Sequence, residues 1–294
     1  MTIKKVGVIG CGLMGSGIAQ VSAEYGYETV VKEIDQKFLD KGLSMIQKNL
    51  EKGVEKGKIT EDFKKKVLDK IKGTLKDGDL AECDLVVEAI VEEIETKKQL
   101  FADLDKICKP SAIFATNTSS LRVTEMAAAT SRPGRVVGMH FFNPVQVMNL
   151  VEIVKTLVTP KDVLQEVYEF CRGIKKVAIL AKDSPGFVVN RLLAPYFVET
   201  VKALERGLAT VEDIDNGMRL GSGYPMGPLT LLDFVGIDTV YRALSSMYEE
   251  FKEPQFAPPP LMKKMVLLNY LGRKTGKGFY DYSVDPPKVN ELNI

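Results

Sequence analysis

The 294-residue sequence has no tryptophan, only four cysteines and a single histidine, His140. The cysteines at positions 11, 83, 108 and 171 are too widely spaced for a zinc or redox motif, so we expect them to be reduced. One histidine also excludes a His-rich metal site, and we expect no metal. Any chemistry that needs an imidazole must use His140.

Net charge and long apolar runs are also lacking. Forty basic residues oppose thirty-nine acidic ones, which argues against a nucleic-acid-binding protein that depends on an overall positive field. No apolar run approaches the ~18 residues of a membrane span. The N-terminal residues lack the apolar segment of a signal peptide. We therefore expect a cytoplasmic protein with neither nucleic acid nor membrane as a partner.

The length, at ~150 residues per domain, suggests two domains. In the first part, apolar strand-like runs alternate with helical stretches, as in a parallel sheet covered by helices. The sequence therefore predicts an α/β fold with a Rossmann-type domain. The expected strands are 5–9, 28–33, 85–88, 112–115, 136–139, 150–154 and 176–180, and the helices between them lie at about 15–25, 36–52, 95–107 and 161–173.

The pattern changes at Asp183-Ser184-Pro185-Gly186. Ser184 is a candidate N-cap, with Pro185 at the first helical position. Beyond it we expect mainly helices, near 186–206, 211–220, 228–250 and 260–271. The prediction is thus a dinucleotide-binding domain over 1–184 and an all-α domain over 185–294.

Residues 48–72 carry nine lysines and five acidic residues, a local excess of four positive charges. Charge runs are usually exposed faces, so the segment could simply be a solvated helical hairpin that leaves the sheet. A basic hairpin beside a cofactor domain could instead hold a phosphorylated substrate.

The motif Gly10-Cys11-Gly12-Leu13-Met14-Gly15 lies between a buried strand and an amphipathic helix. Glu33 follows eighteen residues after Gly15, close to the ~20 expected for a ribose-binding carboxylate. This context predicts a dinucleotide site, although a purely structural Gly-rich turn is an alternative. A carboxylate at Glu33 favours NAD over NADP, while the neighbouring Lys32 weakens that argument. The strand end at Ala89 should lie beside the cofactor.

Two polar segments follow later strands. Thr116-Asn117-Thr118-Ser119-Ser120 could cap a helix near 122–128 or line the ligand crevice. His140 follows the strand at 136–139, and Glu152 lies within an apolar run. Because a buried carboxylate needs a partner, we expect Glu152 to pair with His140, which would make the imidazole a better base. Asn190 lies in an apolar helical stretch, and its spacing does not show whether its partner is protein or ligand.

These motifs together resemble the L-3-hydroxyacyl-CoA dehydrogenase family, most closely its bacterial 3-hydroxybutyryl-CoA-specific members. The resemblance extends from the Gly-rich turn through His140-Phe141-Phe142-Asn143-Pro144 and Ser184-Pro185-Gly186-Phe187 to Gly278-Phe279-Tyr280. It implies a catalytic His140–Glu152 pair, with Ser119 and Asn190 on the reacting oxygen of the substrate. It also implies contacts of NAD with Glu33, Glu92, Lys97, Ser119, Asn143 and Lys274, and of coenzyme A with Lys52 and Lys56.

The resemblance further implies an acyl-CoA substrate and a homodimer formed through the C-terminal helices. It predicts hydride transfer between NAD and (S)-3-hydroxybutyryl-CoA or acetoacetyl-CoA, with His140 as general acid and base. Glu33 departs from the aspartate of many relatives. Two alternatives remain, a β-hydroxyacid dehydrogenase that acts on a free hydroxy acid and a catalytically inactive NAD-binding protein of the same fold.

Overall fold

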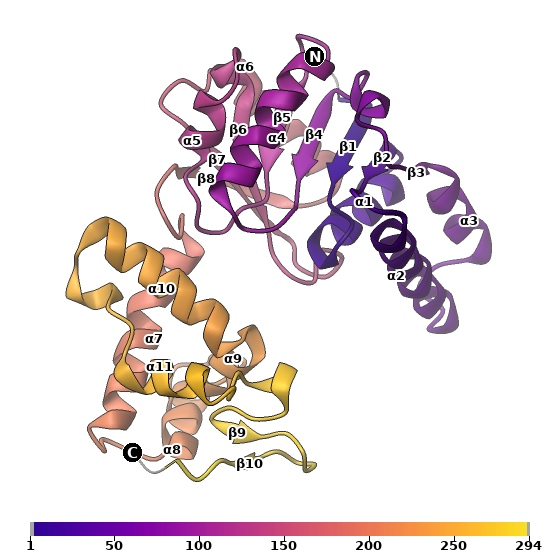
Figure 1. The fold of residues 1–294 in the computed structure, drawn as a ribbon. Coiled ribbons are helices and arrows are strands. Elements are labelled where there is room, and N and C mark those ends of the chain that lie inside the picture. The colour runs from indigo at the N-terminus through magenta and orange to yellow at the C-terminus, as the bar shows by residue number, and fades with distance from the viewer. Residues whose placement is uncertain (1–2, 293–294) are drawn as a thin grey trace. The chain divides into compact units, whose positions relative to one another are not determined.

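A computed structural model describes residues 3–292 as two compact units, the first ending at Phe187 and the second beginning at Val188 (Figure 1). The first unit contains an eight-stranded sheet of order β3-β2-β1-β4-β5-β6-β7-β8. The strands are β1 (Lys5–Ile9), β2 (Glu28–Lys32), β3 (Ile71–Thr74), β4 (Leu85–Glu88), β5 (Ile113–Thr116), β6 (Val136–Phe141), β7 (Leu150–Lys155) and β8 (Val177–Lys182).

Helices connect these strands as the alternating pattern predicts. They are α1 (Leu13–Glu24), α2 (Gln36–Glu55), α3 (Glu61–Asp69), α4 (Ile94–Ile107), α5 (Val123–Ala128) and α6 (Lys161–Gly173). Neighbouring strands pair in parallel from β3 to β6 and again from β7 to β8, whereas β6 and β7 pair antiparallel. The predicted α/β fold with a Rossmann-type sheet is confirmed.

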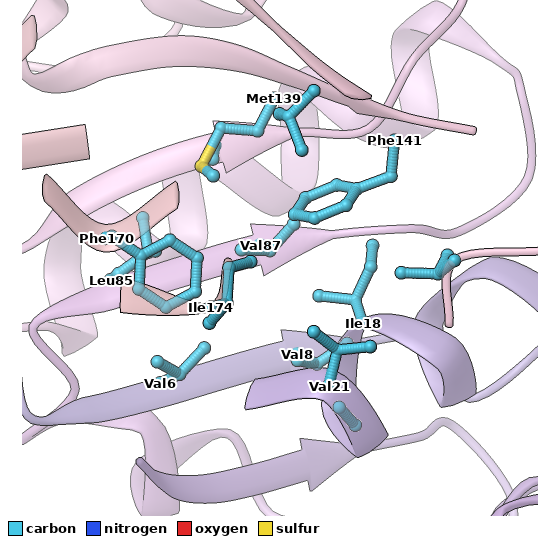
Figure 2. Close-up of a cluster of buried hydrophobic side chains, with 14 of the residues drawn as sticks. Val6, Val8, Ile18, Val21, Leu85, Val87, Met139, Phe141, Phe170 and Ile174 are labelled. Carbon is cyan, nitrogen blue, oxygen red and sulfur yellow. The ribbon is translucent and has the colours of Figure 1, made fainter. Parts of the chain in front are cut away.

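One part of the core of this unit lies between one face of the sheet and helices α1 and α6. Figure 2 shows side chains from β1, β4 and β6 facing Ile18 and Val21 of α1, Phe170 of α6 and Ile174, the C-cap residue of α6. These side chains are at most 2 % exposed, and each contributes roughly 1.5–3 kcal/mol through its burial. The packing fixes the strands and thereby the loops at their carboxyl ends. The sheet residues of this cluster that Figure 2 labels are Val6, Val8, Leu85, Val87, Met139 and Phe141.

The second unit is mainly helical. Its helices are α7 (Val189–Glu205), α8 (Val211–Asn216), α9 (Pro228–Val235), α10 (Ile237–Phe251) and α11 (Pro260–Leu267), and β9 (Tyr280–Asp281) pairs with β10 (Lys288–Val289). The buried Asp233 of α9 accepts hydrogen bonds from the backbone N–H groups of Phe279 (3.0 Å) and Tyr280 (2.9 Å). Burial raises the pKa of Asp233 to about 6. The two hydrogen bonds to this carboxyl group tie the C-terminal segment to α9.

The predicted helix start at Ser184 is wrong. Gly186 and Phe187 have φ values of +81° and +46°, which are incompatible with a right-handed helix. Helix α7 therefore begins only at Val189. The single helix expected over 228–250 is also divided, because Gly236 adopts a φ of +103° between α9 and α10.

Candidate active site

The Gly-rich turn joins β1 to α1 in a conformation that suits a dinucleotide. Gly10 has a φ of +88°, and a Cβ atom there would lie 2.6 Å from the Ala89 carbonyl oxygen. A Cβ atom at Gly15 would lie 1.8 Å from the Gly10 carbonyl oxygen. At Gly12, in contrast, a Cβ atom would have no neighbour within 4 Å. The turn is thus tightly packed at its ends and open at its centre, where a pyrophosphate could approach the start of α1.

Leu13 and Met14 form the first turn of α1, which has no side-chain cap at its N-terminus. Leu13 is 62 % exposed and Met14 is partly buried. The backbone N–H groups of a helix start normally need an acceptor, and an anionic ligand can supply one. These features fit NAD, with the pyrophosphate at the N-terminus of α1.

Glu33 lies directly after β2 and reaches back to the Gly-rich turn. Its Oε1 accepts a hydrogen bond from the Cys11 N–H at 2.6 Å, and its Oε2 accepts one from the Ile34 N–H at 2.9 Å. Burial, and secondarily the Glu33 charge, raises the pKa of Cys11 to about 12, so its thiol is inert. Lys32 pairs with Asp77 at 2.7 Å. Its ammonium therefore does not neutralise Glu33.

A polar cluster lies where β4 and β5 end. Glu92 accepts hydrogen bonds from the Thr118 hydroxyl, from the Ser119 N–H at 3.1 Å and from the Ser120 hydroxyl at 3.3 Å. The Asn117 side chain accepts one from the Phe141 N–H at 2.9 Å. The loop with Ser119 is thereby held beside the strand that carries His140. The sequence leaves open whether residues 116–120 cap a helix or line the ligand crevice. In the structure their hydroxyl groups bond chiefly to Glu92 and to the loop itself.

His140 and Glu152 are directly opposite each other in the antiparallel pair of β6 and β7. The His140 Nδ1 atom lies 2.7 Å from a Glu152 carboxylate oxygen, and the two side chains are 8 % and 0 % exposed. Because Glu152 engages Nδ1, Nε2 is the ring nitrogen left for a substrate. The rings of Phe142 and Phe187 lie 4.5 Å and 5.7 Å from the imidazole, centre to centre. The imidazole is thus oriented in an apolar surrounding.

The loop between β6 and β7 is held by a lysine that sequence reasoning missed. Lys176 donates to the carbonyl oxygens of Val145 at 2.7 Å and Met148 at 2.8 Å. Burial lowers the pKa of Lys176. Asn143, for which the resemblance implies a cofactor contact, lies exposed in the same loop. Lys176 therefore fixes the connection between the two paired residues of the site.

The remaining expected site residues belong to α2 and to the second unit. Lys52 is exposed in the last turn of α2, and Lys56 is the exposed C-cap residue that follows it. Asn190 lies in the first turn of α7, in the second unit, where it is partly buried. Lys274, also in that unit, forms an ion pair with Asp238. The first unit by itself brings together the Gly-rich turn, Ala89, Glu92, Asn117, Ser119, His140 and Glu152.

The part of the chain that the structure describes has neither a candidate metal site nor a helix that could span a membrane. Over residues 3–292, no group of three or more His, Cys, Asp or Glu side chains could hold a metal ion. No helix in this range is long and apolar enough to cross a membrane.

The fold and this site define an NAD-dependent oxidoreductase with a histidine–carboxylate pair. The model of the 3-hydroxyacyl-CoA dehydrogenase NAD-binding domain matches residues 5–184, and that of the C-terminal domain of the same enzymes matches residues 186–282. The chain belongs to the 3-hydroxyacyl-CoA dehydrogenase family, as its motifs predict.

Relatives of known identity cover nearly the whole chain. A 3-hydroxybutyryl-CoA dehydrogenase from Clostridioides difficile is 46 % identical over 279 residues, which are 95 % of this chain and 99 % of that protein. The mitochondrial hydroxyacyl-coenzyme A dehydrogenase of Sus scrofa is 45 % identical over 287 residues, 95 % of this chain and 91 % of that protein. The crystal structure of (S)-3-hydroxybutyryl-CoA dehydrogenase from Ralstonia eutropha is similar with a TM-score of 0.93 at 42 % identity, covering 96 % of this chain and 100 % of that one.

Proposed function

We propose that this protein is an NAD-dependent dehydrogenase that interconverts (S)-3-hydroxybutyryl-CoA and acetoacetyl-CoA. The observation that carries the proposal is the 2.7 Å contact between His140 and Glu152 beside the Ser119 loop, at the same edge of the sheet as the Gly-rich turn. A free hydroxy acid would require neither this pair nor a basic hairpin. Loss of NADH absorbance with acetoacetyl-CoA, compared with free acetoacetate, tests the proposal. Turnover of the free acid alone would contradict it.

In the proposed mechanism His140 Nε2 removes the proton of the 3-hydroxyl group, and in reduction the imidazolium returns it. When bound, NAD supplies the acceptor or donor of the hydride. Glu152 holds the ring through Nδ1 and stabilises its charged form. Ser119 and Asn190 would hydrogen-bond the reacting oxygen as negative charge develops on it, which lowers the barrier in the manner of an oxyanion hole.

The proposal extends to the location and assembly of the protein. We propose that the protein acts in the cytoplasm. We also expect a homodimer formed through the C-terminal helices, as the family resemblance implies. Sedimentation velocity of the purified protein measures the assembly directly, and a monomer at working concentration would contradict this part.

Lys56 tests whether the basic hairpin binds coenzyme A. We expect Lys56→Ala to raise KM for acetoacetyl-CoA about fivefold, because an exposed charge contributes roughly 1 kcal/mol. KM for NADH should hardly change, and added salt should reduce the effect, since ~0.1 M salt screens exposed charges beyond about 10 Å. Steady-state kinetics at two salt concentrations measure both parameters.

Lys41→Ala is the matched control, because Lys41 is an exposed lysine of α2 about 22 Å away along the helix. Lys41→Ala should leave KM for acetoacetyl-CoA unchanged. A thioester that lacks the nucleotide part of coenzyme A provides the second comparison. If Lys56→Ala impairs both thioesters equally, the hairpin lysines do not bind the nucleotide.

Glu33 should make the enzyme prefer NADH to NADPH. In the proposed binding mode its carboxylate would accept the ribose hydroxyls, so that a 2′-phosphate would meet like charge at a cost of several kcal/mol. Lys32 is occupied by Asp77. We expect kcat/KM to be about 100-fold higher with NADH. Glu33→Gln should narrow this ratio, mainly by improving the use of NADPH. Equal efficiency of the two cofactors with the wild-type protein would contradict this assignment.

A further inference from the structure

A buried ion pair lies beneath the loop that carries Ser119. Lys97 of α4 places its ammonium 2.5 Å from Oε1 of Glu88, the last residue of β4, and their side chains are 1 % and 0 % exposed. The same oxygen accepts the Ile90 N–H at 2.7 Å, and Oε2 accepts the Thr116 hydroxyl at 2.6 Å. Both oxygens of Glu88 are therefore bonded, and the carboxylate is held from β5 as well as α4.

A second carboxylate connects this pair to the polar loop. Glu92 Oε2 lies 3.2 Å from the Lys97 ammonium, while Glu92 Oε1 accepts the Ser119 N–H at 3.1 Å. The contacts thus run from Glu88 through Lys97 and Glu92 to the backbone of Ser119. Lys97, for which the resemblance implies a cofactor contact, has two carboxylates around its ammonium. Because Glu88 holds this ammonium in place, its main effect is to fix the position of the Glu92 side chain.

Stability alone does not account for this arrangement. Burying two charges costs several kcal/mol per ion, and their attraction often only balances that cost. What the pair does provide is a fixed position for a charge in a tightly packed surrounding. Thr116 adds to this, since its hydroxyl donates to Glu88 and accepts the Thr118 N–H at 3.2 Å in the same loop.

We propose that Glu88 is a positioning residue for Ser119, which it places through Lys97 and Glu92. The inference rests on the proposed function, in which the Ser119 hydroxyl binds the reacting oxygen of the substrate. Without the Glu88 carboxylate, the Lys97 ammonium is held only by Glu92 and can draw that side chain away from the Ser119 N–H. The Ser119 hydroxyl then loses its fixed place in the loop.

The test compares Glu88→Gln in two backgrounds, wild type and Ser119→Ala. In the wild type we expect Glu88→Gln to lower kcat/KM for acetoacetyl-CoA on the order of 10-fold, within the range for residues coupled through one network. In the Ser119→Ala background, where no hydroxyl is left to position, the same substitution should change kcat/KM by less than about twofold. If the role of Glu88 were merely structural, Glu88→Gln would lower kcat/KM by the same factor in both backgrounds.

Asp84→Asn is the matched control, because Asp84 directly precedes β4, at the end of the strand opposite Glu88. Its carboxylate also pairs with a lysine, Lys109 at 2.7 Å, and accepts the N–H groups of Lys4 and Lys5. We expect it to lower the melting temperature while kcat/KM stays within about twofold of wild type. If Glu88→Gln does not fold, Glu88→Asp keeps the charge but shortens the side chain by one methylene, which withdraws the carboxylate from Lys97. It should show the same dependence on Ser119, with a smaller loss.

The outcomes separate the two proposals. Equal losses in both backgrounds, or no loss in either, would overturn the positioning role while the dehydrogenase activity stands. A wild-type protein that does not reduce acetoacetyl-CoA with NADH would overturn the proposed function, and this inference with it.

Discussion

Replacing His140 with glutamine should lower kcat for acetoacetyl-CoA reduction by about 10²–10⁴-fold, the usual contribution of general acid–base catalysis. The chain contains no other imidazole, and this one is fixed by Glu152 between two aromatic rings. Glutamine approximates the size of the ring and keeps a polar end, so the substitution removes the proton-transfer group with little change in packing. Steady-state kinetics at saturating NADH measure the loss.

The control for this variant is cofactor binding. The Gly-rich turn and Glu33 are built from β1, α1 and β2, none of which depends on the His140 side chain. NADH fluorescence titration should therefore give an affinity close to that of the wild type, and the melting temperature should fall by only a few degrees. A variant that retains more than half of the wild-type kcat would end the assignment of His140 as general acid and base.

The dinucleotide half of the site was predictable because its signals are local. A buried strand, a Gly-rich turn and a helix follow one another within twenty residues, and Glu33 directly follows the next strand. Gly10 and Gly15 have a local steric reason, as the close approach of Gly15 to the Gly10 carbonyl shows. The early predicted strands are likewise apolar at successive positions, which is typical of strands buried on both faces.

Other parts of the fold depend on contacts that no short segment reveals. Strand β3 was missed because Ile71-Lys72-Gly73-Thr74 is a mixed-polarity sequence at the sheet edge, and its pairing with β2 decides its conformation. The helix start at Ser184 was misplaced because a plausible cap sequence precedes two left-handed residues. Capping preference is worth only ~1 kcal/mol, which tertiary packing of Phe187 against His140 can exceed.

Two site residues had no local signal. Lys176 reaches carbonyl oxygens 28 and 31 residues earlier in the chain, and Lys97 pairs with Glu88 across a strand–helix connection. A lysine in an amphipathic helix ordinarily predicts an exposed position, so only the folded structure shows that Lys97 is 1 % exposed. Their surroundings could not be derived from residue type and spacing.

Glu152 should prove nearly as important as His140, and two substitutions separate its two contributions. Glu152→Ala removes both the orientation of the ring and the negative charge, so we expect kcat to fall about 10²–10³-fold, within the range for general acid–base catalysis. Glu152→Gln keeps an oxygen that can accept a hydrogen bond from Nδ1–H but removes the charge that stabilises the imidazolium. Its loss should be smaller, about 10–10²-fold, a cost of roughly 1.4–2.8 kcal/mol.

Melting temperatures, measured together with kcat, distinguish a catalytic role of Glu152 from a purely structural one. Glu152 is fully buried in the centre of β7, so either variant disturbs the core and should lower the melting temperature, more for alanine than for glutamine because alanine also leaves a cavity. Asp84→Asn provides the comparison, since it disrupts a mostly buried carboxylate away from His140. If Glu152→Gln and Asp84→Asn lower the melting temperature and kcat in the same proportion, Glu152 only supports the sheet. A kcat loss far beyond that of Asp84→Asn at equal destabilisation would assign Glu152 to the chemistry of His140.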